Sequence, residues 1–297
     1  MPSYISHAIH GEKLFEKLND EKILKEDVEL SKLKSYTIAY DYAYLVKGLD
    51  NHNYSAKDYL LFIIRYIKKN HLQGNVSILA YLYGHVAHFY LDAYTHPLIY
   101  YIERGCIPTS FLPSHFMVEG YLNTYLSERV LKKDILDVHA DYFNKADLNN
   151  KEIQELIKTS YMMIYGKNDV IKSFKLVRKF FTGIEVLYKD IFRSKKMVSD
   201  ITNFKLFLTK NRITLPEIAN ENHGLWFNPV TGKMHTDSFL DLFYKSIDKS
   251  LDTINDINKY FYNNESYDRL ERIIPDISLD TGVSRKRGLL MKYKRKI

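Results

Sequence analysis

Two histidines and an aspartate stand four residues apart in succession in the segment GHVAHFYLDAYTHP: His88, Asp92 and His96. Residues at positions i, i+4 and i+8 lie along one face of a helix, so two imidazoles and one carboxylate share a single stripe. Further along, the segment HFMVE places His115 and Glu119 four residues apart in the same way. Imidazole nitrogens and carboxylate oxygens are ligands of Zn²⁺, and two such helices side by side can share more than one ion.

A single histidine in such a segment is more simply explained as a packed core residue with hydrogen-bond partners. The set is harder to explain in that way, because Asp92 lies in a stretch that is apolar almost all round. A buried carboxylate must be paired or metal-bound, since burying it bare is costly. For His85, one turn before His88, we keep the packing interpretation.

Three further candidates lie upstream. His7 precedes the first expected helix. His10 follows His7 by one turn and could replace His7 as a candidate. Asp41 comes after the segment YTIAY, and His52 lies in the turn DNHNYS. Each of these residues alone could cap a helix or decorate a loop. Their order along the chain is informative: His, Asp, His, then HxxxDxxxH, then HxxxE.

The elements that must position these residues are helices. Ser55 is suited to cap a helix over SAKDYLLFIIRYIKK, and Ser114 to cap one that runs to about Lys133. Helices are also expected over residues 76–95, 151–165, 169–194, 199–209 and 236–262, with a long structured loop over 210–236 and no strand of useful length. Pro97 disfavours helical geometry at His96, so a break or kink is expected there.

Composition places the chain among globular proteins. Of its 297 residues, 45% are hydrophobic and 27% are charged, which is too apolar for a disordered chain. The single cysteine, Cys106, excludes an intramolecular disulfide and a Cys-rich zinc module. No signal peptide is visible and no apolar run approaches the length of a membrane span, so we expect a cytoplasmic protein. The expected fold is one all-α, multi-helix domain over residues 1–275, followed by a basic tail over 276–297.

The excess positive charge lies at the C-terminus. The segment SRKRGLLMKYKRKI, from Ser284 to Ile297, holds seven basic residues and no acid. Without it the chain has 36 basic and 36 acidic residues, so the body is formally neutral. Such a tail can bind an anionic membrane surface or nucleic acid. The alternative is a solvated, frayed terminus.

The order of histidines and acids resembles the zinc-dependent phospholipase C family, whose relatives include bacterial phosphatidylcholine-cleaving enzymes and fungal single-strand nucleases. The resemblance begins at MPSYISHAIHG, continues through Asp41 and His52, and is strongest over LYGHVAHFYLDAYTHPLIYY and HFMVEGYLN. A later block, ENHGLWFNPVTGKMHTDSFLDLF, is similar to a stretch typical of the intracellular bacterial branch. The resemblance implies an all-α domain of the phospholipase C and nuclease type.

The resemblance also implies ligands for two or three zinc ions: Asp41, His52, His88 and Asp92 for the first, His96, His115 and Glu119 for the second, and His7 with a bridging Asp92 for a third. Two features depart from the secreted relatives. Those enzymes use the amino group and carbonyl of an N-terminal tryptophan on the third metal, whereas this chain begins with Met-Pro. In this chain His96 follows Asp92 by four residues, whereas in those enzymes the corresponding histidine follows its aspartate by six.

The activity implied is hydrolysis of a phosphodiester by zinc-activated water. Asp41 is the candidate to orient or deprotonate that water, and Asn123 could support a ligand through a hydrogen bond. A phospholipid is the leading substrate, because the sequence resembles the phospholipase branch more closely. A single-strand nuclease or another phosphodiesterase is the alternative, since aromatic residues suit lipid and nucleic acid alike. A non-catalytic zinc-binding protein is disfavoured, since every expected ligand type is present.

Overall fold

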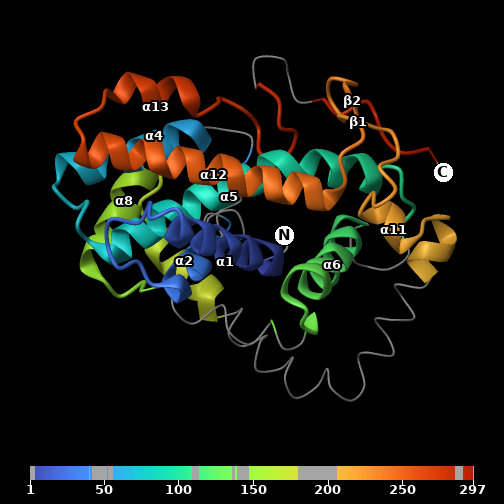
Figure 1. Cartoon of the computed structure of the whole chain (residues 1–297), viewed down its shortest axis with the longest axis horizontal. Coiled ribbons are helices and arrows are strands. Elements are labelled where there is room, and N and C mark those ends of the chain that lie inside the picture. Colours follow the sequence, from blue (N-terminus) through green and yellow to red (C-terminus); the bar gives the residue numbers. More distant parts are fainter. Residues whose placement is uncertain are drawn as a thin grey trace.

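The computed structural model describes residues 4–39, 41, 52, 56–108, 114–135, 138, 147–179, 206–284 and 290–296. Apart from one short hairpin, the regular structure in these ranges is helical (Figure 1), which confirms the all-α fold. The helices with assigned bounds are α1 Tyr4–Asp20, α2 Leu30–Tyr36, α4 Ala56–Lys69, α5 Val76–Glu103, α6 Ser114–Leu126, the π-helical turn η1 Ser127–Leu131, α8 Lys151–Tyr165, α11 Leu215–Ile218, α12 Phe239–Tyr262 and α13 Tyr267–Ile273.

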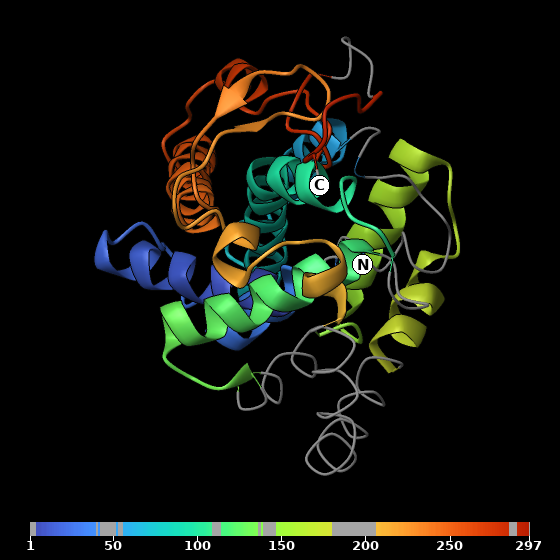
Figure 2. The ribbon, with the colours of Figure 1, turned by 90° about the vertical axis from the view of Figure 1, so that its right-hand side faces the viewer.

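Helix α5 is the central element of the fold. Asn75 caps its start by accepting hydrogen bonds from the backbone N–H groups of Ser77 and Ile78. The helix is apolar on nearly every side and buried along most of its length, as expected for a helix enclosed by others. Helices α1, α2, α4, α6, α8 and α12 all pack against it (Figures 1 and 2). Residues projecting from α5 therefore meet side chains from widely separated parts of the chain.

Helix α5 continues through Pro97 to Glu103, so of the break or kink expected at His96, the break is wrong. Proline removes the hydrogen bond to the carbonyl of Ala93. Gly282, in a left-handed conformation with φ +64°, lies against that carbonyl: a Cβ atom at Gly282 would stand 2.6 Å from the Ala93 oxygen and 3.2 Å from Pro97 Cγ. Packing on all sides outweighs the local cost of the proline. As a result, His96 stays on the same helical face as His88 and Asp92.

Other expectations hold in part. Helix α1 begins at Tyr4, so His7 lies inside the first helix and not before it. The expected loop over 210–236 contains α11 and an antiparallel hairpin of β1 Trp226–Phe227 with β2 Met234–His235, whose strands are too short for alternation to reveal them. Residues 170–179 are helical. Ser55 and residues 180–205 lie outside the described residues.

The described part of the tail lies on the body of the protein. The backbone N–H groups of Lys292 and Tyr293 both donate to the Pro229 carbonyl, and that of Arg295 donates to Tyr101. The Arg295 guanidinium donates to the backbone carbonyls of Asn211 and Arg212. Residues 290–296 are therefore held by backbone contacts, unlike a frayed terminus, while the boundary at residue 275 stays a prediction. No helix of the described residues is long and apolar enough to cross a membrane.

Gly84 permits the close approach of α5 to the end of α2. A Cβ atom at Gly84 would lie 2.7 Å from the Tyr36 carbonyl carbon and 3.0 Å from the Thr37 nitrogen. We expect Gly84→Ala to lower the free energy of unfolding by about 1–3 kcal/mol, the usual cost of overpacking a core. Gly120→Ala is the matched control, because nothing lies within 4 Å of that position on α6. Urea unfolding of both variants checks this, and equal stability of the two would contradict the packing argument.

Candidate metal centre

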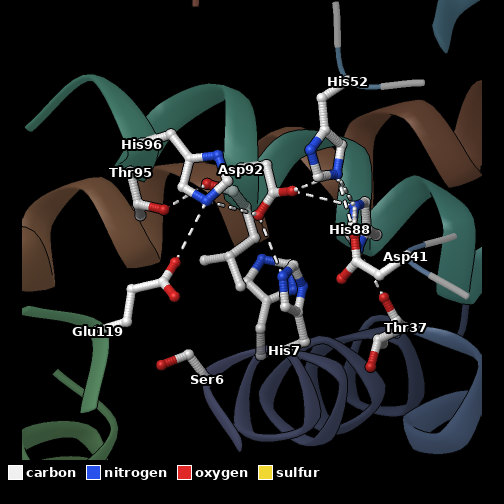
Figure 3. Close-up of polar contacts among 12 residues, drawn as sticks. Ser6, His7, Thr37, Asp41, His52, His88, Asp92, Thr95, His96 and Glu119 are labelled. Atoms are coloured by element: carbon white, nitrogen blue, oxygen red, sulfur yellow. Dashed lines mark hydrogen bonds and ion pairs between the residues drawn. The ribbon is translucent and has the colours of Figure 1, made fainter. Parts of the chain in front are cut away.

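Asp92 is the centre of a buried cluster of histidines and carboxylates (Figure 3). Its Oδ1 lies 3.1 Å from His7 Nε2 and 3.7 Å from His96 Nε2. Its Oδ2 lies 3.0 Å from His88 Nε2 and 3.5 Å from His52 Nε2. One carboxylate thus stands between histidines that come from α1, from two turns of α5 and from the segment before α4.

A first group of donors consists of Asp41, His52 and His88. His52 Nε2 lies 3.0 Å from Asp41 Oδ1, and 3.4 Å from His88 Nε2. On its other side the His88 ring donates through Nδ1 to the Thr37 carbonyl at 2.8 Å. This hydrogen bond places the ring proton on Nδ1, so the Nε2 lone pair faces the group, as a metal ligand requires.

A second group consists of His96, His115 and Glu119. His115 Nε2 lies 3.0 Å from Glu119 Oε1, and His96 Nε2 lies 3.6 Å from the same oxygen. His115 is the most exposed of these three side chains. A narrow pocket, with room for about one water molecule, lies beside His96 and Glu119.

A third group consists of His7, His88 and Asp92. The rings of His7 and His88 are stacked, with centroids 4.4 Å apart. The start of α1 is held in place by Asn123, whose Oδ1 accepts from the backbone N–H and the hydroxyl of Ser6. Asn123 therefore positions the helix that carries His7.

The two histidines with uncertain roles in the sequence both lie outside these groups. The Ser246 hydroxyl on α12 gives its own proton to the Phe243 carbonyl, so it must accept a hydrogen bond from His10 Nε2. His10 is therefore hydrogen-bonded to α12, whereas His7 faces Asp92. His85 donates through Nδ1 to the Tyr81 carbonyl, and its ring lies on that of Tyr81. These contacts agree with a packing role for His85.

The residues present fit a metal centre. In each of the three groups the donor atoms all lie within 4.8 Å of one another. Among the described residues, every ion-pair partner of Asp41, Asp92 and Glu119 is a histidine. The buried Glu119 Oε2 has no hydrogen-bond partner in that part of the chain. Neutral imidazoles around buried carboxylates leave negative charge that a cation balances.

The carboxylates and histidines shift one another's pKa values. Burial opposes charge on His52, but the neighbouring Asp41, Asp92 and Asp280 raise its pKa to about 10. Burial likewise opposes charge on His96, while Asp92, Glu119 and Asp280 raise its pKa to about 9. Burial raises the pKa of Glu119, but His115 and His96 outweigh it and hold that pKa at about 2. Without a metal, protons on His52 and His96 supply the balancing charge.

Zinc binding at pH 7 should therefore release protons, because His52 and His96 must give up their protons to act as ligands. The release should fade as pH rises through 9 to 10, the raised pKa values of the two rings. In the metal-free protein these raised values add stability below the unfolded pKa of about 6.5, and that stability is lost above pH 9 to 10. Calorimetric titration with zinc in buffers of different ionisation enthalpy measures the release. A heat of binding independent of the buffer would contradict the protonation states.

Asp280 is a site residue that the sequence analysis missed. Its Oδ1 lies 3.6 Å from Nδ1 of His52 and 3.6 Å from Nδ1 of His96. It belongs to the segment expected to be a tail, and no spacing relates it to the histidine motifs. Only its position in the folded chain reveals it.

Comparison with known families agrees with this geometry. A family model described as zinc dependent phospholipase C matches residues 6–169. The match covers more than half of the chain and includes every ligand predicted from the sequence, so the chain belongs to the zinc-dependent phospholipase C family. Neither curated proteins nor solved structures gave a significant match. Asp280 lies beyond the matched residues.

Proposed function

We propose that this protein hydrolyses the phosphodiester of a phospholipid on the glycerol side of the phosphate, using two or three zinc ions. The observation that carries the proposal is the position of Asp92, buried among four histidines at the junction of the donor groups. Family membership adds the class of reaction, which is hydrolysis of phosphodiesters.

The ligands that we assign to zinc are those predicted from the sequence: His7, Asp41, His52, His88, Asp92, His96, His115 and Glu119. Bound zinc would supply Lewis-acid activation of water and neutralise charge that builds on the phosphate. Asp41 is the residue that we assign to orient the water and accept its proton at a carboxylate oxygen. Glu119 lines the pocket, so it would face the incoming phosphate, with His115 beside it.

The pocket favours a lipid over a nucleic acid. Among the described residues, no lysine or arginine lines it: Asp92, His96, Glu119, Ser6, His7, Leu91, Thr95, Ile99, Leu122 and Phe239 make up its walls. Single-strand nucleases need a basic track for the backbone and aromatic platforms for the bases. The lack of basic residues in this lining therefore favours a phospholipid over a nucleic acid.

The basic tail offers a positively charged surface that could bind an anionic membrane near the metal centre. Arg295 binds the backbone of Tyr101, and the adjacent Tyr100 ring lies 4.9 Å from that of His115. The tail therefore passes the end of α5 that borders the second donor group. Lys292 and Lys294 are exposed there, where they could attract anionic lipid at about 1 kcal/mol per basic residue.

The test is a comparison of three substrates with the zinc-loaded protein: phosphatidylcholine vesicles, single-stranded DNA and a small soluble phosphodiester. We expect release of diacylglycerol and phosphocholine, slower turnover of the small diester and no cleavage of DNA. Asp92→Asn is the control for contaminating activity. Cleavage of DNA alone would favour the nuclease, and zinc binding without any hydrolysis would favour a non-catalytic zinc protein.

A further inference from the structure

A short turn near the C-terminus is attached directly to the metal centre. Residues 277–284 fold back on themselves: Ile277 and Ser284 form an antiparallel bridge, and the Ser278 N–H donates to the Val283 carbonyl. The next N–H, that of Leu279, donates to the carbonyl of His52 at 2.8 Å. This turn, which we call the Asp280 turn, is therefore fixed to the backbone of a predicted ligand.

The side chain of Asp280 faces two predicted ligands at once. One carboxylate oxygen, Oδ1, stands 3.6 Å from Nδ1 of His52 and 3.6 Å from Nδ1 of His96. The side chain is only 13% exposed. His52 belongs to the first donor group and His96 to the second, so a single carboxylate lies behind a ligand of each group.

Both imidazoles direct Nε2, the opposite nitrogen, toward the centre. His52 Nε2 faces Asp41, and His96 Nε2 faces Glu119. A neutral imidazole can offer Nε2 to a metal only when its proton is on Nδ1. A carboxylate beside Nδ1 favours that tautomer through its charge, and at 3.6 Å Asp280 Oδ1 acts on both rings as an ion-pair partner just beyond hydrogen-bond distance. The Thr37 carbonyl favours the same tautomer of His88.

We propose that Asp280 is a positioning residue that fixes the Nε2-binding tautomer of His52 and His96 together, and so joins the two donor groups into one centre. The proposal deepens the proposed function, because it rests on the same zinc ligands. It assigns a role in metal binding to a segment outside the residues that the family model matches.

Two contacts hold the Asp280 turn in place. The Asn228 side chain donates from Nδ2 to the Thr281 carbonyl at 2.8 Å. Gly282 lies against the Ala93 carbonyl, where any Cβ atom would come within 2.6 Å. The turn is therefore tied both to the loop after β1 and to α5, one residue from Asp92. Such fixed support is what a group that orients ligands needs.

The experiment measures zinc affinity in full-length variants by competition with a chromophoric chelator, so it does not depend on any hydrolytic activity. Asp280→Asn keeps the size of the side chain and removes its charge. We expect it to weaken both zinc-binding steps by roughly 10- to 100-fold, the usual effect of losing an outer partner of a ligand histidine. Asp280→Glu, which restores the carboxylate, should bind zinc more tightly than Asp280→Asn. Cobalt substituted for zinc should show an altered visible spectrum in Asp280→Asn.

The matched control is Thr281→Val, at a neighbouring buried position on the same turn. It keeps the shape and the backbone contact to Asn228, so its zinc affinity and cobalt spectrum should equal those of the unmodified protein. Zinc affinity of Asp280→Asn within twofold of normal would overturn the proposal, and so would weakening of only one step. A metal-free Asp280→Asn protein that unfolds would also overturn it, because the role of Asp280 would then be structural. Failure of the phospholipid assay with these affinities as expected would contradict only the proposed function.

Discussion

Replacing Asp92 with asparagine should abolish stoichiometric zinc binding and phosphodiester hydrolysis together. The Asp92 carboxylate faces His7 and His96 through one oxygen and His52 and His88 through the other. Asparagine keeps the size but removes the charge and one acceptor oxygen, so each donor group that includes or borders Asp92 loses its shared anion. We expect zinc affinity to fall by more than about 100-fold, beyond the effect of losing an outer partner. Elemental analysis after dialysis, with the hydrolysis assay, measures both losses.

His85→Gln is the comparison variant for Asp92→Asn on the same helix. His85 is buried, donates to the Tyr81 carbonyl and lies against the ring of Tyr81, but it belongs to none of the donor groups of the described residues. We expect near-normal zinc content and a loss of stability of about 0.5–3 kcal/mol, as for ordinary core substitutions. If both variants lose zinc equally, our assignment of the metal-binding face of α5 is wrong.

Removal of zinc should produce the second large effect, a drop in thermal stability. The buried carboxylates Asp41, Asp92 and Glu119 pair only with histidines among the described residues, so without zinc only protons on those histidines can balance their charge. Free zinc at 1,000 times its dissociation constant stabilises the folded state by about 4.1 kcal/mol per site. For a domain of this size each kcal/mol shifts the melting temperature by roughly 2–4 °C.

Calorimetry before and after treatment with a chelator measures this effect, and re-addition of zinc should restore the original melting temperature. We expect about two tightly bound zinc ions per chain in protein purified without chelator. Protein that contains no stoichiometric metal, gains none on dialysis against zinc and melts at an unchanged temperature would contradict the metal centre.

The sequence by itself determined the fold class and most of the candidate ligands. The spacing of His88, Asp92 and His96 is periodic on a helix, so local geometry alone brings them to one face. The same holds for His115 and Glu119. The unbroken apolar character of residues 76–95 predicted a central buried helix, because only an enclosed helix is apolar on every side. These inferences depend on contacts between residues close in the chain.

Only the tertiary structure decided which upstream residues meet that face. His7 and His10 are one turn apart, and spacing alone cannot choose between them, although the resemblance favoured His7; in the fold α12 engages His10 while Asp92 faces His7. The course of α5 through Pro97 likewise depends on Gly282, which packs against the carbonyl that the proline leaves free.

Asp280 shows the limit of sequence inference most clearly. It lies in a segment that composition assigns to a tail, yet it stands behind His52 and His96. Local periodicity carries no information about such a contact, because the packing of distant segments sets it. The helical repeat therefore determined the face of α5 that can bind metal, and long-range packing decided which other residues complete and support it.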